Sequence, residues 1–217
     1  MGKYGGFMII AIDGPAGTGK STIANIIADK LNITFLNSGG FYRTLTMALL
    51  DAGIDIKDEK AVLDFCKKQK IEYTKESHFI LNGTDVTAHL HDDRVTANTS
   101  QVSSIVEVRH LVNDLMRKIT ASLSIVCEGR DMTTVVFPNA EYKIYLDASS
   151  EVRARRRFDQ GVSDMTLEEI KAAIEKRDEM DKNKKEGSLK IAPDALYIDT
   201  SDLTIDKVCE IILNKIS

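Results

Sequence analysis

Residues 7–31 of the chain read FMIIAIDGPAGTGKSTIANIIADKL, which joins an apolar run, a glycine-rich turn and an amphipathic stretch. The apolar run Phe7–Ile12 is rich in isoleucine, which is typical of a strand buried on both faces. Beyond the glycines, Ile23, Ile27 and Leu31 recur at helical spacing. We therefore expect a buried strand that turns through the glycines directly into a helix.

The segment GPAGTGKS at residues 14–21 fits the spacing G-x-x-x-x-G-K-[ST]. Its glycines let successive backbone N–H groups converge on phosphate oxygens, and the helix that follows adds partial positive charge. Lys20 is expected to reach the β- and γ-phosphates, and the Ser21 hydroxyl to ligate Mg²⁺. The alternative is a glycine-rich turn with an incidental lysine. The residues assigned to triphosphate binding are Gly14, Pro15, Ala16, Gly17, Thr18, Gly19, Lys20, Ser21 and Thr22.

The rest of the chain alternates short apolar runs with helical patterns, which favours a parallel α/β sheet flanked by helices. Four further strands are expected at Ile33–Leu36, Ser124–Cys127, Lys143–Leu146 and Leu196–Ile198, and a closing helix at Thr204–Ile216. Two stretches break the alternation. Residues 71–87, between helical patterns at 58–69 and 104–121, are expected to form two strands joined by an Asn82-Gly83 turn. Residues 151–190 are densely charged, with Arg153, Arg155, Arg156 and Arg157 first, then a break at Gly161 and a capping-box helix from Thr166 to about Lys182.

Length and composition place the chain among globular proteins. Of its 217 residues, 43% are hydrophobic and 29% charged, and its net charge of −4 disfavours a surface built to hold a nucleic acid polymer. Cys66, Cys127 and Cys209 are far apart, which disfavours disulfide and metal frameworks. With neither a signal peptide pattern nor a membrane-length apolar run, we expect a cytoplasmic monomer that forms a single domain with insertions.

Polar residues that follow the predicted strands point to an acceptor site. In open α/β sheets, ligands gather beyond the carboxyl ends of the strands. Lys20, Ser38, Arg43, Arg130 and Asp131 are therefore expected to converge there. Taken singly, each arginine is more often a solvated surface residue.

The chain resembles the bacterial type of cytidylate kinase, a nucleoside monophosphate kinase of the P-loop class, nearly from end to end. The resemblance rests on IDGPAGTGKST at 12–22, NSGGFYR at 37–43, ANTSQVSSIVEVR at 97–109, EGRDMTTVVFP at 128–138, KIYLDAS at 143–149, VRARRR at 152–157 and KRDEMDKN at 176–183.

The resemblance implies a P-loop kinase domain over residues 1–217 and transfer of the ATP γ-phosphoryl group, with Mg²⁺, to CMP or dCMP. Its core covers 1–37, 122–150 and 191–217, its monophosphate-binding insertion about 38–121, and its lid with the following helix about 151–190. The alternatives are a P-loop kinase for another nucleotide or small-molecule acceptor, and a nucleotide-binding regulatory module without turnover.

The resemblance also assigns the acceptor contacts. Ser100, Arg109 and Asp131 fall on cytosine; a carboxylate accepts from the 4-amino group, and an arginine donates to N3 and O2. Ser100 could instead be a helix cap. Arg177 and Asp181 fall on the ribose, or else form an ordinary helix ion pair. The acceptor phosphate falls to Arg43, Arg130 and Lys184, beside Ser38.

The arginines of the charged stretch supply the expected lid. Mobile arginines that fold over the transferring group would stabilise its negative charge and exclude water. We assign Arg153 and Arg157 to catalysis together with Lys20, against the alternative of a solvated helix.

The chain departs from the family pattern at four positions. Lys184 stands where the family usually has arginine, Glu128 for aspartate, Thr133 for glycine and Ser188 for proline. If residue 133 needs a positive φ, threonine there would be strained.

Overall fold

A computed structural model of the chain describes residues 7–161 and 165–216. Residues 1–6 of the predicted core, residues 162–164 of the predicted lid, and residue 217 lie outside this description. The chain folds into two compact units. Unit 1 comprises Met1–Ile33 and Ile125–Ser217, and unit 2 comprises Thr34–Ser124.

Strands and helices alternate along only part of the chain. The strands are β1 (Ile9–Asp13), β2 (Thr34–Asn37), β3 (Ile71–Tyr73), β4 (Phe79–Leu81), β5 (Thr84–Asp85), β6 (Ile125–Gly129), β7 (Tyr142–Asp147) and β8 (Leu196–Asp199). The α-helices are α1 (Lys20–Leu31), α2 (Ser38–Asp51), α3 (Glu59–Cys66), α4 (Asp93–Val102), α5 (Val106–Thr120), α6 (Ser150–Asp159), α7 (Leu167–Lys182) and α8 (Ile205–Ile216). Two short turns are the 3-10 helix η1 (Thr87–His89) and the π-helix η2 (Met132–Val136).

The predicted five-stranded parallel sheet is confirmed, with the strand order β2-β6-β1-β7-β8. The central strand β1 pairs in parallel with β6 and β7, and β7 pairs in parallel with β8. Ile10, Ala11 and Ile12 are completely buried, as expected for a strand covered on both faces. The glycine-rich turn therefore begins at the carboxyl end of the central strand of the sheet, directly after Asp13.

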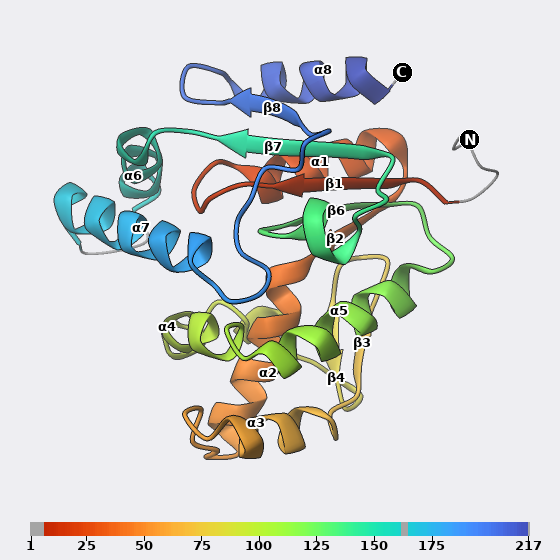
Figure 1. Ribbon diagram of the computed structural model, residues 1–217, viewed down its shortest axis with the longest axis vertical. Helices are drawn as coiled ribbons and strands as arrows, with labels where there is room; N and C mark the ends of the chain where they lie inside the picture. The colour runs from red at the N-terminus through yellow and green to blue at the C-terminus, as the bar shows by residue number, and fades with distance from the viewer. Residues whose placement is uncertain (1–6, 162–164, 217) are drawn as a thin grey trace. The chain divides into compact units, whose positions relative to one another are not determined.

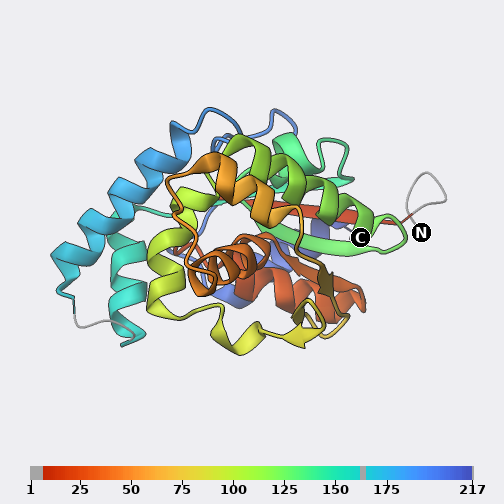
Figure 2. The ribbon, with the colours of Figure 1, turned by 90° about the horizontal axis from the view of Figure 1, so that it is seen from below.

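The helices of unit 1 take two kinds of position. Some pack against its strands, and others lie beyond the carboxyl ends of the strands. Helix α1 packs against β1, β6 and α8. Figure 1 shows α6 and α7 beyond the ends to which the β1 and β7 arrows point, and Figure 2 again shows the two helices side by side. The capping box predicted for α7 is present, because Thr166 Oγ1 accepts from the Glu169 backbone and Glu169 accepts in return from the Thr166 N–H.

Unit 2 combines α2, α3, α4 and α5 with a small antiparallel sheet in the order β3-β4-β5. The prediction of two strands over residues 71–87 is therefore wrong by one strand. The Asn82-Gly83 turn is present, with φ of 50° and 88°, but a second turn at Ser77, with φ of 65°, splits the preceding run. At this turn the Thr74 N–H donates to the His78 carbonyl over 3.0 Å.

The three cysteines, Cys66, Cys127 and Cys209, are buried free thiols, so the described residues bear out the prediction that they form no disulfide framework. Burial raises the pKa of each thiol above its usual range. These groups therefore belong to the packing of the fold.

Candidate active site

The glycine-rich turn between β1 and α1 has the backbone that the motif predicts. Gly14, Gly17 and Gly19 have φ of 151°, 84° and 85°, which favour glycine. A Cβ on Gly14 would lie 2.0 Å from the Leu146 carbonyl oxygen, so the loop passes β7 too closely for any side chain. Helix α1 begins at Lys20, which puts the N-terminal end of the helix at the loop. This strand, loop and helix form a site for anionic phosphate.

Lys20 lies inside the loop rather than on its surface. It is 5% exposed, and its Nζ donates to the Pro15 carbonyl oxygen over 2.6 Å. Burial lowers the pKa of Lys20 to about 7, and the nearby charge of Arg130 adds to this effect, whereas Glu128 and Asp13 oppose it. Arg177 also lowers the pKa, so the side chains of three predicted cations in unit 1 act on one another.

Ser21 and Glu128 meet at the base of α1. The Ser21 hydroxyl donates to Glu128 Oε1 over 3.1 Å. Glu128 is the last residue but one of the buried strand β6. Within the described ranges no group of three or more His, Cys, Asp and Glu side chains is arranged to hold a metal ion. Mg²⁺ in phosphoryl-transfer sites uses one or two protein ligands together with substrate phosphates, so a hydroxyl beside a carboxylate fits this ion. In the sequence Glu128 stands out only as a departure from the family pattern, and nothing near it in the chain signals this contact.

Asp181 on α7 holds two of the predicted acceptor cations. Its carboxylate accepts from Arg130 Nε over 2.8 Å and pairs with Lys184 Nζ at 3.0 Å. Burial opposes ionisation of Asp181, but the charges and hydrogen bonds of Arg130 and Lys184 outweigh it and lower the pKa of this carboxyl. The structure thus brings together Arg130, which follows β6, with Asp181 and Lys184 at the end of α7. Asp181 therefore lies in a buried network with Arg130 and Lys184.

Arg153 differs most from its expected state. It is 4% exposed, and it donates to the Ala148 and Ala16 carbonyl oxygens over 2.9 and 3.0 Å. Its third contact is a 2.6 Å ion pair with Asp178 of α7. Arg153 was expected to be a mobile lid cation or else part of a solvated helix. The solvated alternative is wrong for Arg153, because the packing of α6 against α7 encloses its side chain.

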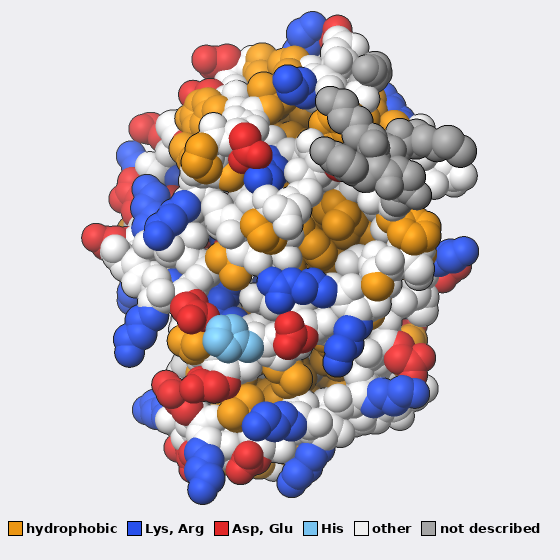
Figure 3. All heavy atoms as spheres, turned by 45° about the vertical axis from the view of Figure 1, so that its right-hand side comes forward, with side chains coloured by type: hydrophobic (Ala, Val, Ile, Leu, Met, Phe, Trp, Pro, Cys, Tyr) orange, Lys and Arg blue, Asp and Glu red, His pale blue; other side chains and the backbone are white. Residues whose placement is uncertain are grey.

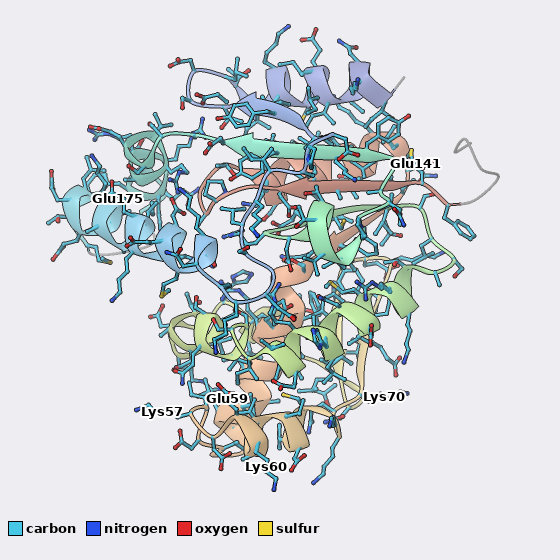
Figure 4. The ribbon with its side chains drawn as sticks, in the orientation of Figure 1. Lys57, Glu59, Lys60, Lys70, Glu141 and Glu175 are labelled. Atoms are coloured by element: carbon cyan, nitrogen blue, oxygen red, sulfur yellow. The ribbon has the colours of Figure 1, made fainter. Side chains whose placement is uncertain are left out.

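The neighbouring arginines of α6 are arranged differently. Arg157 is exposed, as expected for a lid residue, and Arg156 bonds to Thr200 Oγ1 over 3.1 Å. Between the two helices, Ser150 Oγ donates to Glu175 over 2.8 Å, and Figure 4 labels Glu175 on α7. Only some of the arginines in this stretch therefore face solvent.

Four predicted acceptor residues belong to unit 2, where α2 packs against α4 and α5. Arg43 on α2 donates to Thr96 Oγ1 over 2.8 Å and to the Leu90 carbonyl oxygen over 3.1 Å. Ser38 is the buried first residue of the same helix. Ser100 lies within α4, two residues before the last helical position, so the alternative that it caps the helix is wrong.

Arg109 on α5 is also held within unit 2. It is 4% exposed and donates to the Ser103 carbonyl oxygen over 3.1 Å. Its guanidinium carbon lies 5.7 Å from the centroid of the Tyr42 ring. Such a position over an aromatic ring stabilises the cation and orients its N–H groups.

The concern about strain at Thr133 is removed by its backbone. Within the described chain, the non-glycine residues with positive φ are Asn32, Ser77 and Asn82. Thr133 instead belongs to η2, and both its N–H and its hydroxyl donate to Asp13. Asp13 had no predicted role, although an acidic residue directly before the glycine-rich loop was a visible signal.

The outer surface carries charges of both signs. Basic and acidic side chains are interspersed over the face drawn in Figure 3. Figure 4 labels four exposed residues of unit 2, Lys57, Glu59, Lys60 and Lys70. Among the helices of the described residues, none has both the length and the apolar character that a bilayer crossing requires.

Comparisons with known proteins bear on the fold and on the family of the chain. Two solved structures resemble the fold: an uncharacterized protein from Eubacterium ventriosum (TM-score 0.53, 14% identity, 96% of this chain and 97% of that one) and a shikimate kinase from Bacteroides thetaiotaomicron (TM-score 0.50, 12% identity, 96% and 98%). Curated proteins named cytidylate kinase are much more similar in sequence. That of Borrelia hermsii is 44% identical over 95% of this chain and 96% of its own, and that of Clostridioides difficile is 40% identical over 98% and 99%. The sequence model of the family described as cytidylate kinase matches residues 10–217. The chain therefore belongs to the cytidylate kinase family.

Proposed function

We propose that this protein transfers the γ-phosphoryl group of ATP to CMP or dCMP, which yields ADP and the nucleoside diphosphate. Membership of the cytidylate kinase family supplies the class of enzyme. The observation that carries the proposal is the loop between β1 and α1. There the charges of Arg130 and Arg177 act on the buried Lys20 and lower its pKa. Two anionic substrates must approach each other in this reaction, and a cluster of cations offsets their repulsion.

On the ATP side, residues 14–22 hold the phosphates through the backbone N–H groups that all of them except Pro15 carry, and Lys20 exchanges its bond to Pro15 for a phosphate oxygen. Ser21 and Glu128 are the residues that would hold Mg²⁺. When bound, the ion would neutralise charge on the phosphates. The contact between Ser21 and Glu128 supports this assignment.

On the acceptor side, Arg43, Arg130 and Lys184 bind the phosphate of CMP, with Ser38 beside them. The network around Asp181 supports this, because Asp181 keeps Arg130 and Lys184 together until a phosphate group shares them. Arg177 and Asp181 contact the ribose. The acceptor phosphate oxygen then attacks the γ-phosphorus in line, and catalysis consists of positioning and charge stabilisation.

Cytosine is read by Ser100, Arg109 and Asp131. The ionised Asp131 only accepts hydrogen bonds, which suits the 4-amino group of cytosine and opposes O4 of uracil. Arg109 only donates, which suits N3 and O2. Sites built in this way reject analogues because a mismatched base leaves buried polar groups unpaired.

Arg157 is the lid cation of α6, since it is exposed and free to turn toward the transferring group. Arg153 supports the same reaction from its buried position against the Ala16 carbonyl oxygen. We also propose a cytoplasmic monomer whose P-loop core carries an insertion at about 38–121 and a lid at about 151–190. The match between that insertion and unit 2, Thr34–Ser124, supports the division.

A coupled assay of ADP release with CMP, dCMP, UMP and AMP tests the proposal. We expect turnover with CMP or dCMP, far slower turnover with UMP and AMP, and none without added Mg²⁺. Comparable rates with UMP would contradict the cytosine-reading set and favour another acceptor. Binding of ATP and CMP in a calorimeter without any turnover would favour a regulatory module.

A further inference from the structure

Asp13, the last residue of β1, is a buried carboxylate that accepts hydrogen bonds from one short segment. Its two oxygens accept from Met132 N over 2.9 Å, from Thr133 N over 2.7 Å and from Thr133 Oγ1 over 2.6 Å. These donors are the first two residues of η2, and Asp13 itself is 0% exposed. Asp13 thus ties the start of the phosphate loop to the start of η2.

The segment that lies between these attachments carries Arg130 and Asp131. On one side of it, Gly129 is paired in register with Asp13 across β6 and β1. On the other side, Met132 and Thr133 are held by the Asp13 side chain. Arg130 and Asp131 are therefore flanked on both sides by residues that contact Asp13. Asp131 is further held through its backbone carbonyl, which accepts from Val135 N over 2.9 Å.

The hydroxyl of Thr133 is the part of this attachment that a glycine, expected there from the family pattern, does not have. A backbone N–H is present with any residue except proline, so the two N–H bonds do not depend on the side chain. The hydroxyl adds a third, short bond to a charged acceptor, and such bonds are stronger than neutral ones. Burial raises the pKa of Asp13 to about 6 against the effect of these bonds, so its charge depends on every donor that reaches it.

We propose that Thr133 is a positioning residue of the acceptor site. Its hydroxyl holds the Arg130-Asp131 segment against the end of β1, so that the two side chains keep one orientation toward the acceptor nucleotide. The inference rests on the proposed function, in which Arg130 binds the acceptor phosphate and Asp131 the cytosine. A merely structural hydroxyl would stabilise the fold and change the use of both substrates equally.

The pair Thr133→Ser and Thr133→Ala tests the inference, because the two variants differ by a single oxygen atom. For Thr133→Ala we expect KM for CMP to rise at least fivefold, while KM for ATP stays within twofold of wild type. Thr133→Ser should restore both values to within twofold. Equal changes in both KM values, the same KM for CMP in both variants, or a wild-type KM for CMP in Thr133→Ala would each overturn the inference. Thr133→Gly, which keeps both N–H bonds, replaces Thr133→Ala if the latter does not fold.

Hydrogen exchange of the free protein separates failure of the inference from failure of the proposed function. The amides of Met132 and Thr133 should exchange at least fivefold faster in Thr133→Ala than in Thr133→Ser, whatever the protein phosphorylates. Equal exchange in the two variants would overturn the inference. Absence of CMP turnover by the wild-type protein would overturn the proposed function and leave the exchange result to be judged by itself.

Discussion

At the scale of single residues, the candidate site contains two ionisable side chains whose burial disfavours their charged forms. Asp13 and Lys20 are both buried, and burial moves the pKa of each toward the neutral form, to about 6 and about 7 respectively. Hydrogen bonds to Asp13 and the charges of Glu128 and Asp13 around Lys20 only partly offset this. Perturbed groups of this kind concentrate at functional sites, because a charge that water does not screen acts strongly on a bound ligand.

The Asp13 charge should make the stability of the protein depend on pH. The pKa of Asp13 is about 6 in the folded state, whereas an unfolded chain releases this proton near the ordinary aspartate value of 3.8. Between these values the folded state binds more protons, so the contribution of Asp13 to the free energy of unfolding falls as the pH rises. Asp13→Asn has no such titration. We expect the unfolding free energy of wild type minus that of Asp13→Asn to fall by about 2 kcal/mol between pH 4 and pH 7.

Denaturant unfolding of both proteins across this pH range measures the difference. A difference that grows as the pH rises would mean that the three hydrogen bonds outweigh burial and hold the pKa of Asp13 below its usual range.

Asp131→Asn tests the reading of cytosine at one side chain. The amide cannot accept at its nitrogen, so one contact to the 4-amino group is lost, and kcat/KM for CMP should fall well over tenfold. The exposed Asp114 on α5, paired with Arg117, gives a matched control, and Asp114→Asn should leave kcat/KM unchanged. Little change in Asp131→Asn would favour an acceptor other than cytidylate.

At the scale of elements, α6 places arginines of one short segment in two different environments. Arg153 is enclosed between the phosphate loop and α7, whereas Arg157, one turn later, is exposed. The spacing of the arginines in the sequence gave no sign of this difference. Asp178, the partner of Arg153, belongs to α7, which starts after the arginine-rich segment. The same holds for Asp181, whose partner Arg130 lies 51 residues away.

The two arginines should respond differently to replacement. Arg153→Met leaves Asp178 as a buried, unpaired charge, so the free energy of unfolding should fall by about 3–5 kcal/mol. Arg157→Met should change stability by less than about 0.5 kcal/mol and lower kcat at least tenfold, since it removes the exposed lid cation. Thermal unfolding and steady-state kinetics measure both, with the exposed Arg155→Met as the control. Unchanged stability of Arg153→Met would contradict the buried role.

Helix α2 contains Gly40, which packs against Phe79 of β4. A Cβ on Gly40 would lie 2.1 Å from Phe79 Cζ of β4, so Gly40→Ala should destabilise the protein by about 1–3 kcal/mol through overpacking. At Gly39 the nearest atom to a Cβ is Asn37 Oδ1 at 3.3 Å, and Gly39→Ala is therefore the control with the smaller loss. Denaturant unfolding compares them, and equal losses would contradict the packing explanation.

At the scale of the whole molecule, features that neighbouring residues specify could be predicted from the sequence, whereas features that depend on contacts between distant residues could not. The strand at β1, the glycine-rich loop and the Thr166 capping box were predictable because neighbouring residues specify them. Helix α2 was not assigned, because Gly39 and Gly40 disfavour a helix unless Phe79, far along the chain, requires the space. The donors to Asp13 likewise lie about 120 residues away along the chain, and only the folded chain brings them together.

The residues assigned to the two substrates are distributed differently between the units. All those assigned to ATP belong to unit 1, whereas those assigned to CMP come from both units, with Ser38, Arg43, Ser100 and Arg109 in unit 2. A ligand protects from hydrogen exchange the segments whose opening would release it. We therefore expect ATP alone to slow exchange in the phosphate loop, and CMP to slow exchange also in α2, α4 and α5.

Hydrogen exchange with each nucleotide alone and with both measures this distribution, and residues 151–161 should slow most when both are bound, since lid closure excludes water. Arg109→Met gives the control. It removes a contact assigned to cytosine in unit 2, so CMP should no longer protect α4 and α5, while ATP should still protect the phosphate loop. Protection of unit 2 by ATP alone, or equal exchange of residues 151–161 with and without nucleotides, would contradict the assignment of these residues to two substrates and a lid.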